Sequence, residues 1–338
     1  MATASVPVAV ALAAVGSAVV WVAGGRLETA SERLGAYYGF PPVVQGAVIA
    51  AVGSSFPELT TAVLSAALHD SGNLGVGAIV GSAIFNILVI PGWSALRGRG
   101  MEADRDVVYK ETQFYMLAVA VFLITLSFGV IYLGSADGGL TATLTRPLAL
   151  VPLALYGVYV FIQHQDVTDY DAPDPGPVDA GRQWLLLAGS LVVIVAGVEA
   201  LVQAALSLET ALGVPSTVWG LTVVAAGTSL PDAAVSVRAA KAGRGTTSLA
   251  NVLGSNTFDL LVAVPAAVLV AGYVEVDFGT AVPMLAFLTV ATLAFLVVTR
   301  THLELTRSEA AGLLALYAVF VGWMATEATG VTGFVPGI

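Results

Sequence analysis

Apolar stretches follow one another along this 338-residue chain, with short polar segments between them. A helix of about 20 apolar residues crosses the hydrocarbon core of a bilayer, so each stretch predicts a membrane span. Short segments of alternating polarity, which would indicate a membrane β-barrel, are not evident. Because the first stretch lacks a basic leader and an obvious cleavage site, it is expected to be a retained span rather than a signal peptide. The ten predicted spans are residues 6–24, 42–68, 74–96, 111–134, 144–163, 183–206, 216–240, 247–272, 279–299 and 309–327.

The pattern of the first half recurs in the second half. GFPPVVQGAVIAAVGSSFPE (39–58) aligns without a gap on GVPSTVWGLTVVAAGTSLPD (213–232), with eight identities in twenty positions. Further along, VGSAIFNIL (80–88) matches LGSNTFDLL (253–261). The constant offset of 173 or 174 residues predicts a duplication with five helices in each half.

An odd number of spans per repeat reverses the orientation of the second copy. The sequence therefore predicts an all-α membrane protein made of two inverted-topology five-helix repeats. The expected division is a first repeat at 1–165, an acidic Pro/Asp-rich linker at 166–181 and a second repeat at 182–338, joined in one membrane domain. This architecture is typical of secondary transporters, whose site lies near the midplane where the repeats meet.

Composition and charge support a membrane location and narrow the chemistry. Hydrophobic residues make up 57% of the chain and charged residues 11%, well below the quarter or so found in soluble domains. The absence of cysteine excludes disulfides and thiolate metal sites. With a net charge of −10, the lipid bilayer and not nucleic acid is the expected partner. A monomer is expected to suffice for transport, and the sequence leaves the oligomeric state open.

Basic residues predict the orientation, because they concentrate in cytoplasmic loops. With the N-terminus outside, twelve of the 13 Lys and Arg residues fall inside and only Arg146 falls outside. We therefore expect a multi-pass protein of the cell membrane whose central acidic loop is cytoplasmic.

Two spans carry a proline directly before an acid, in GSSFPEL (53–59) and GTSLPDA (227–233). Proline removes a backbone donor and clashes with the preceding turn, so each helix is expected to kink or break there. The break would free carbonyls near Ala51 and Ala225. In each copy the acid also shares a helix face with the hydroxyl residue four positions earlier.

The partner spans repeat this arrangement of polar residues. Ser82 and Asn86 share one helix face, as do Ser255 and Asp259 in the second repeat. Four polar stripes can converge on a pocket of hydroxyl, amide, carbonyl and carboxylate oxygens, which are the ligands that Ca²⁺ and Na⁺ prefer. The three histidines lie in loops or at helix ends, so zinc or copper is not expected, and His69 is expected to be a solvated loop residue.

Three carboxylates would meet in this pocket: Glu58, Asp232 and Asp259. An uncompensated charge at membrane depth costs at least about 2.5–3.5 kcal/mol. One Ca²⁺ with one monovalent cation, or three Na⁺, would neutralise the site, and two alternative loads are what an exchanger needs. The alternative is that the acids are protonated or paired with a basic residue. Glu199 has no matching acid in the first repeat and is expected to have a structural or gating role.

These residues resemble the cation/calcium exchanger superfamily, sodium/calcium exchanger branch, whose motifs read roughly G-[TS]-S-x-P-[ED] and G-S-[NA]-x-F-[ND]. This chain has both motifs in each half, at 53–58 and 81–86 and again at 227–232 and 254–259. The resemblance implies sodium-driven calcium antiport by alternating access, with Na⁺ and Ca²⁺ as transported ions, no cofactor and no enzymatic activity. It also implies that the first and sixth helices form a sliding gate.

The resemblance further assigns twelve positions to ion sites. Glu58 and Asp232 would be the central calcium carboxylates. Hydroxyls and carbonyls that would complete the cation sites come from Ser54, Ser55, Thr228, Ser229, Ala51 and Ala225. The flanking monovalent sites would take Ser82, Asn86, Ser255 and Asp259.

Two positions depart from the simplest pattern of this branch. Asp232 replaces the more usual Glu, and Ala83 stands where an Asn often sits, as Asn256 does in the other repeat. Both features favour the potassium-dependent exchangers, so K⁺ co-transport stays open. A Ca²⁺/H⁺ antiporter of the same fold remains an alternative because carboxylates can be protonated, although the residues flanking Glu58 differ from the pattern of that branch. An antiporter of Mg²⁺ is a further alternative, disfavoured because Mg²⁺ dehydrates reluctantly.

Overall fold

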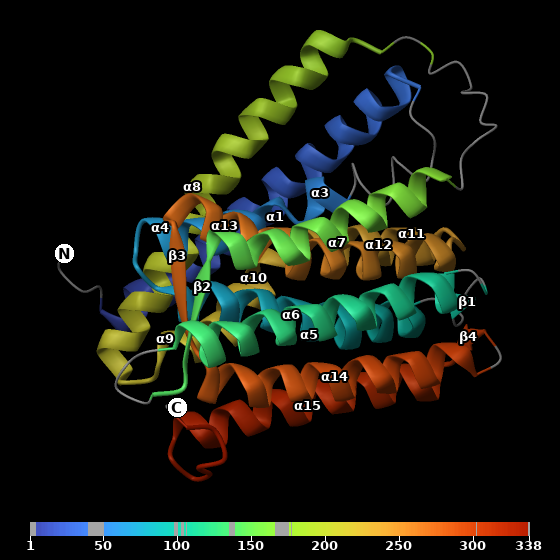
Figure 1. Cartoon of the computed structure of the whole chain (residues 1–338). Coiled ribbons are helices and arrows are strands. Elements are labelled where there is room, and N and C mark those ends of the chain that lie inside the picture. Colours follow the sequence, from blue (N-terminus) through green and yellow to red (C-terminus); the bar gives the residue numbers. More distant parts are fainter. Residues whose placement is uncertain are drawn as a thin grey trace.

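Most of the long helices of the chain run nearly parallel to one another (Figure 1). Within the residues that the structure describes, eight helices are long and apolar enough to cross a membrane, and the bent pair Ser216–Thr228 and Leu230–Lys241 is a ninth candidate. The predicted span at 42–68 is described only from residue 51 onwards. The computed structural model describes residues 5–39, 51–97, 101–102, 105, 107–134, 139–165, 176, 178–301 and 303–336.

The described helices divide between the two halves of the chain. Those of the first half are α1 (Val6–Tyr37), α3 (Ala51–Ser54), α4 (Phe56–Ala67), α5 (Gly72–Arg97), the π-helical turn η2 (Val107–Glu111), α6 (Thr112–Leu133) and α7 (Arg146–Gln165). Those of the second half are α8 (Ala180–Leu212), α9 (Ser216–Trp219), η3 (Gly220–Val224), α10 (Ala225–Thr228), α11 (Leu230–Lys241), α12 (Gly245–Phe258), η4 (Asp259–Ala263), α13 (Val264–Ala271), α14 (Phe278–Arg300) and α15 (Arg307–Ala328).

Helices α1 and α8 are longer than predicted. The apolar runs end at residues 24 and 206, but the helices continue to Tyr37 and Leu212. Hydropathy locates the part of a helix that is apolar and not its end, and the added segments are rich in good helix formers such as Ala, Leu and Glu. The second extension stops where Gly213 adopts a left-handed conformation, with φ of 69°.

Two short antiparallel ribbons were not predicted. Strand β2 (Thr141–Thr145) pairs with β3 (Tyr273–Asp277), and β1 (Met101–Glu102) pairs with β4 (Glu304–Leu305). Each ribbon joins a segment of the first half to a segment of the second half. The fold is therefore predominantly and not exclusively helical, and residues 144–145 belong to β2 instead of the predicted fifth span.

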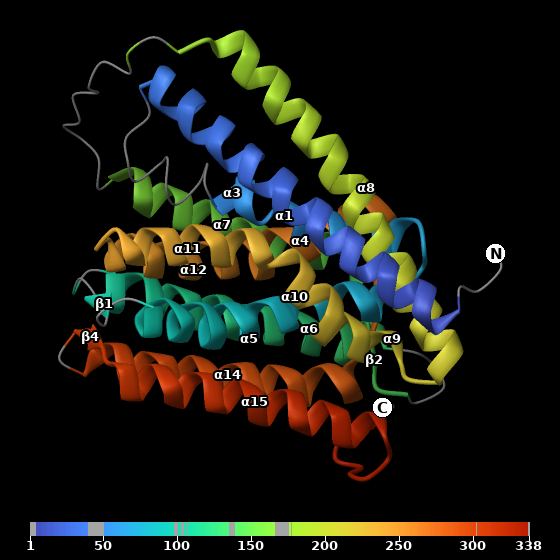
Figure 2. The ribbon, with the colours of Figure 1, turned by 180° about the vertical axis from the view of Figure 1, so that it is seen from behind.

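Helices α5 and α12–α13 lie in the middle of the molecule. In their most apolar windows, 89% of residues of α5 and 83% of those of α12–α13 are buried by protein, against 22–39% in the other six spans. Helices α1 and α8 lie side by side and cross the remaining helices at an angle (Figures 1 and 2). They form a two-helix layer on the outside of the bundle.

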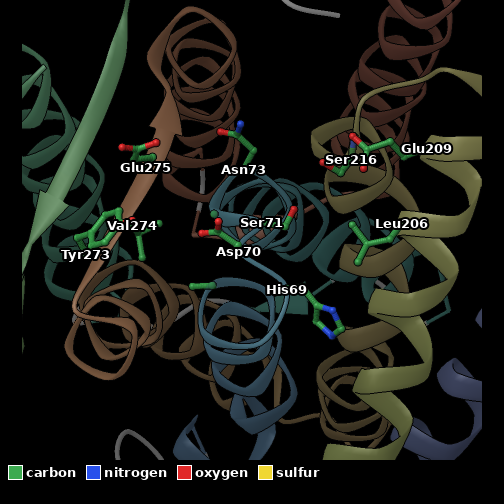
Figure 3. A pocket seen from close by; sticks show the side chains of 12 residues that line it. His69, Asp70, Ser71, Asn73, Leu206, Glu209, Ser216, Tyr273, Val274 and Glu275 are labelled. Carbon is green, nitrogen blue, oxygen red and sulfur yellow. The ribbon is translucent and has the colours of Figure 1, made fainter. Parts of the chain in front are cut away.

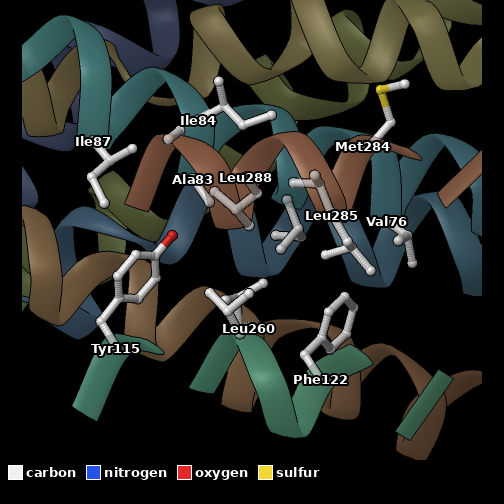
Figure 4. Packing of buried hydrophobic residues seen from close by; sticks show 14 of the residues in the cluster. Val76, Ala83, Ile84, Ile87, Tyr115, Phe122, Leu260, Met284, Leu285 and Leu288 are labelled. Atoms are coloured by element: carbon white, nitrogen blue, oxygen red, sulfur yellow. The ribbon is translucent and has the colours of Figure 1, made fainter. Parts of the chain in front are cut away.

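An apolar layer surrounds α5. Its members come from several helices, and Figure 4 shows Tyr115, Phe122 and Leu260 facing Ile84 and Leu285 across this layer. All five side chains are at most 1% exposed. This packing holds α5 and η4 in fixed positions, and both carry candidate site residues.

The two halves meet at close backbone contact along α5. A Cβ atom on Gly81 of α5 would collide with the backbone of Leu221 in η3, and one on Gly220 would lie 2.5 Å from the Leu74 carbonyl oxygen. Glycine at these positions lets the first-half helix lie directly on the second-half segment that leads to Asp232.

Candidate ion-binding site

Two buried carboxylates stand at the starts of equivalent helices. Glu58 lies in the first turn of α4 and Asp232 in the first turn of α11, and each follows a proline. Proline is compatible with the first turn because the backbone N–H groups of that turn have no intrahelical acceptor, so none is lost. An acid in the first turn interacts favourably with the helix dipole. The α9–α10 segment and α11 meet at a 46° bend. Glu58 is 1% exposed and Asp232 is fully buried.

One oxygen of Glu58 faces two serine hydroxyls. Ser82 Oγ and Ser229 Oγ lie 3.4 and 3.3 Å from Glu58 Oε1, and 2.8 Å from each other. The two hydroxyl protons are therefore shared among three contacts. Ser82 belongs to the first half and Ser229 to the second, so this carboxylate is held by both repeats.

Asp232 has a matching environment. Ser255 Oγ donates to Asp232 Oδ1 at 3.2 Å, and Asn86 Nδ2 donates to Asp232 Oδ2 at 3.1 Å. Ser54 Oγ lies 3.1 Å from Ser255 Oγ, while Ser55 Oγ donates to the Ser255 carbonyl at 3.5 Å. Each carboxylate thus accepts one hydrogen bond from its own repeat and one from the other.

Several acceptor oxygens in this cluster have no hydrogen-bond partner. Among the described residues they are Glu58 Oε2, Asn86 Oδ1 and both carboxylate oxygens of Asp259. All three side chains are at most 1% exposed. A buried acceptor without a donor costs free energy, and more so when it is charged. Since the amide oxygen and the oxygens of ionised carboxylates can only accept or coordinate, the arrangement fits cations bound between them.

The cluster depends on neutral oxygens as much as on charge. Among the residues that the structure describes, no three His, Cys, Asp or Glu side chains are close enough together to hold one metal ion, so the predicted meeting of three carboxylates around one ion is not seen. Serine hydroxyls and the Asn86 amide separate the carboxylates instead. Hydroxyl, amide and carboxylate oxygens form a hard ligand set that suits Ca²⁺ and monovalent cations.

Comparison with known proteins identifies the family. A model of the family described as sodium/calcium exchanger protein matches residues 8–165 and 182–326. The chain belongs to this family. It is similar to the inner membrane protein YrbG of Escherichia coli, with 29% identity over 75% of this exchanger and 77% of the relative. It is also similar to the sodium/calcium exchanger MaX1 of Methanosarcina acetivorans, with 26% identity over 84% and 89% of the two chains. Among solved structures, the sodium-calcium exchanger NCX_Mj soaked with 10 mM Na⁺ and zero Ca²⁺ gives a TM-score of 0.65 at 25% identity, covering 94% of this exchanger and 99% of that chain.

The remaining predicted positions of the exchanger have intrahelical contacts. Thr228 Oγ1 lies 3.1 Å from the Val224 carbonyl and 3.2 Å from the Ala225 carbonyl. The Ala225 carbonyl also accepts from the Ser229 N–H at 3.1 Å, so a cation at Ala225 would compete with two donors. Ala51 is the first residue of α3, and its side chain is not among the parts of the chain that the structure describes.

One residue of the cluster was missed by the sequence prediction. Asn256 is fully buried, accepts from Asn86 Nδ2 at 3.1 Å and donates to the Ala83 carbonyl at 3.1 Å. The signal was present in the GSN of the second repeat, but Asn256 was compared with Ala83 and not placed among the ligands. Its contact with Asn86 connects helices more than 150 residues apart in sequence.

His69 lies in a turn, as predicted, but the prediction that its side chain is solvated is wrong. His69 Nε2 lies 3.0 Å from both oxygens of Glu199 on α8, and the side chain is only 15% exposed. The two residues come together because α8 passes the turn between α4 and α5. A cavity of about 420 Å³ opens beside this pair, and Figure 3 shows Asp70, Glu209 and Glu275 around it.

Proposed function

We propose that this exchanger moves Na⁺ and Ca²⁺ in opposite directions across the cell membrane by alternating access. The observation that supports this proposal most directly is the set of four unpartnered, buried acceptor oxygens on Glu58, Asn86 and Asp259. Family membership supplies the reaction class, and the oxygen chemistry agrees with it.

Charge balance explains why the same site can serve two loads. Glu58, Asp232 and Asp259 carry up to three negative charges, and all three side chains are buried and interact electrostatically. One Ca²⁺ plus one monovalent cation, or three Na⁺, would neutralise them, and an unbalanced charge would cost about 2.5–3.5 kcal/mol or more. Binding of one of these sets of ions therefore excludes the other set. The protein can change between its two orientations when the site is neutral, while a partly filled site disfavours this change.

The proposed ligands follow from the geometry and the motif together. Glu58 and Asp232 bind Ca²⁺, while Asn86 and Asp259 provide oxygens for flanking monovalent cations. The remaining proposed contributors are Ser54, Ser55, Thr228, Ser229, Ser82, Ser255 and the carbonyls of Ala51 and Ala225.

The proposed architecture has ten spans in two inverted repeats, divided at the 166–181 linker, with proline breaks before Glu58 and Asp232 and the N-terminus outside. Helices α1 and α8 form the moving layer. The close contact between them, where a Cβ on Gly16 would lie 2.8 Å from the Gly197 carbonyl oxygen, supports their movement as one unit.

The monovalent partner of Ca²⁺ in this proposal is Na⁺ or K⁺. Asp232 in place of Glu, and Ala83 in place of Asn, favour K⁺ co-transport as in the potassium-dependent exchangers. A requirement for K⁺ on the same side as Ca²⁺ is the expected signature.

The test is uptake of radioactive calcium into proteoliposomes that contain the purified full-length protein. An outward Na⁺ gradient should drive uptake, and Glu58→Gln and Asp232→Asn should abolish it. Each condition is measured with and without K⁺ to assign co-transport. Uptake driven equally by a proton gradient without Na⁺ would assign the Ca²⁺/H⁺ alternative, and no Ca²⁺ movement under any gradient would overturn the calcium assignment.

A further inference from the structure

The two copies of the second motif differ in how their side chains are held. With the repeat offset of 173 residues, Asn256 corresponds to Ala83 and Asp259 corresponds to Asn86. All four residues are fully buried. Asn86 and Asn256 form a side-chain hydrogen bond between the repeats, whereas the equivalent residues Asp259 and Ala83 do not.

That bridge uses both protons of one amide. Asn86 Nδ2 donates to Asp232 Oδ2 at 3.1 Å and to Asn256 Oδ1 at 3.1 Å. Asn256 is itself fixed, because its own Nδ2 donates to the Ala83 carbonyl at 3.1 Å. With both protons engaged, the Asn86 amide cannot turn without losing a buried hydrogen bond.

The oxygen of Asn86 is the atom left over by this arrangement. Asn86 Oδ1 is buried and has no hydrogen-bond partner, in the same cluster as the unpartnered Glu58 Oε2. An amide oxygen points away from its nitrogen, so anchoring the nitrogen determines where the oxygen points. We propose that Asn256 is a positioning residue that acts through Asn86, holding the Asn86 oxygen toward the transported cation.

The other repeat explains why the bridge occurs only once. An Asn at position 83 would by symmetry face residue 259, as Asn256 faces Asn86. Because ionised Asp259 can only accept, such an Asn would turn its Nδ2 toward the carboxylate and occupy one of its oxygens. Ala83 has no side-chain donor, and both oxygens of Asp259 remain without a partner. The side-chain bridge therefore forms at the neutral candidate ligand, Asn86, and no such bridge occupies the oxygens of the charged candidate ligand, Asp259.

This inference rests on the proposed function, because it concerns a residue that supports a ligand of the same site. It is tested by a double-mutant cycle in proteoliposomes, using Asn256→Ala, Asn86→Ala and the double variant. Asn256→Ala should raise the KM for Ca²⁺ by about tenfold, the size expected from one buried hydrogen bond, with much less change in maximal rate.

The double variant distinguishes positioning from a general structural role. If Asn256 acts through Asn86, the double variant should have the same KM as Asn86→Ala. Losses that simply add would mean that the two residues act independently, and this would overturn the inference. Thr257→Val is the matched control, because it removes a buried hydroxyl from the adjacent residue that has no hydrogen-bond partner.

Folding is checked by thermal unfolding of each purified variant. Should Asn256→Ala not fold, Asn256→Ser is measured, since its side chain is too short to join Asn86 to Ala83. A wild-type KM in a folded Asn256→Ser protein would overturn the inference. Should the wild-type protein carry another divalent cation in place of Ca²⁺, the proposed function fails, and the same cycle measured with that cation still tests the bridge.

Discussion

The central helices and the α1–α8 layer are built in different ways. Helices α5 and α12–α13 are 83–89% buried in their apolar windows, whereas α1 and α8 are 28% and 33% buried. The central helices carry Ser82, Asn86 and Ser255, whose hydrogen bonds fix the candidate site. The outer layer therefore has much less protein contact to break if it moves. In the proposed mechanism, ligand binding and conformational change belong to separate parts of the molecule.

The outer layer is also connected to the rest of the protein through ion pairs. Glu28 of α1 accepts from Arg238 in the last turn of α11 at 3.2 Å, and Glu199 of α8 pairs with His69 just after α4. In the proposed inverted topology, α4 and α11 end at opposite sides of the membrane. Each outer helix is thus held to the opposite repeat by one ion pair.

The largest effect is expected from removing charge in the central site. Glu58→Gln should lower Ca²⁺ transport by about a hundredfold or more, because a buried cation loses a charged partner. Glu28→Gln is the matched control in the outer layer, and it should retain Ca²⁺ binding and change mainly the transport rate. Initial uptake rates across a Ca²⁺ series measure both quantities. Equal loss of affinity in the two variants would contradict the division of roles.

A second contrast uses two glycines. Gly81→Ala in α5 should destabilise the protein by about 1–3 kcal/mol. Its Cβ would collide with the Leu221 backbone, and the close contact between α5 and η3 cannot relax freely. Gly25→Ala in α1 has no atom within 4 Å of the added Cβ and should leave stability unchanged or slightly raised. Thermal unfolding of both detergent-solubilised variants checks the difference. Equal unfolding temperatures of the two variants would show that the contact between α5 and η3 can accommodate the added methyl group, and would contradict this prediction.

The Glu28–Arg238 pair should give a smaller effect. Arg238→Ala is expected to lower stability by about 1–2 kcal/mol, because Glu28 is 5% exposed and would lose a donor to its buried carboxylate. Adding Glu28→Leu should recover part of this loss, since replacing both partners by apolar groups is less costly than removing one. Unfolding temperatures of the two single variants and the double variant test this order. A double variant less stable than either single variant would contradict it.

The smallest effect is expected at His69 and Glu199. This pair is partly exposed, at 15% and 35% of the two side chains, so its contribution to stability should be below about 1 kcal/mol. Glu199→Gln can still hydrogen-bond His69 and should change stability less than Glu199→Leu. Both variants should retain the wild-type KM for Ca²⁺ in the uptake assay. A raised KM would place Glu199 in the binding machinery.

From the sequence, the approximate positions of the long helices could be predicted more closely than the contacts between side chains of different helices. Hydropathy located the long helices because contact with lipid requires apolar residues along a whole span. The repeated motifs placed polar residues on the partner helices, and Ser82 and Ser255 lie within hydrogen-bond distance of Glu58 and Asp232. The ends of α1 and α8 were missed because helix formation continues where apolar character stops.

The Asn256 bridge and the π-helical turns could not be predicted in the same way. Whether an amide faces its own repeat or the other depends on side-chain packing between helices far apart in sequence. Likewise, η4 begins at Asp259, whereas Asn86 lies within the regular helix α5, although the two positions are equivalent in the repeats. Such turns are frequent at functional sites but have no simple sequence signature.

The β2–β3 ribbon has a consequence for how the protein is made. Its partners, residues 141–145 and 273–277, lie more than 120 residues apart, so the first strand leaves the ribosome long before the second exists. Pairing of segments so distant in sequence is slow and comes late in folding. Until then an unpaired strand edge remains open to incorrect partners. Closure of this ribbon is therefore a late step of assembly, because it joins the two halves only after residues 273–277 have been made.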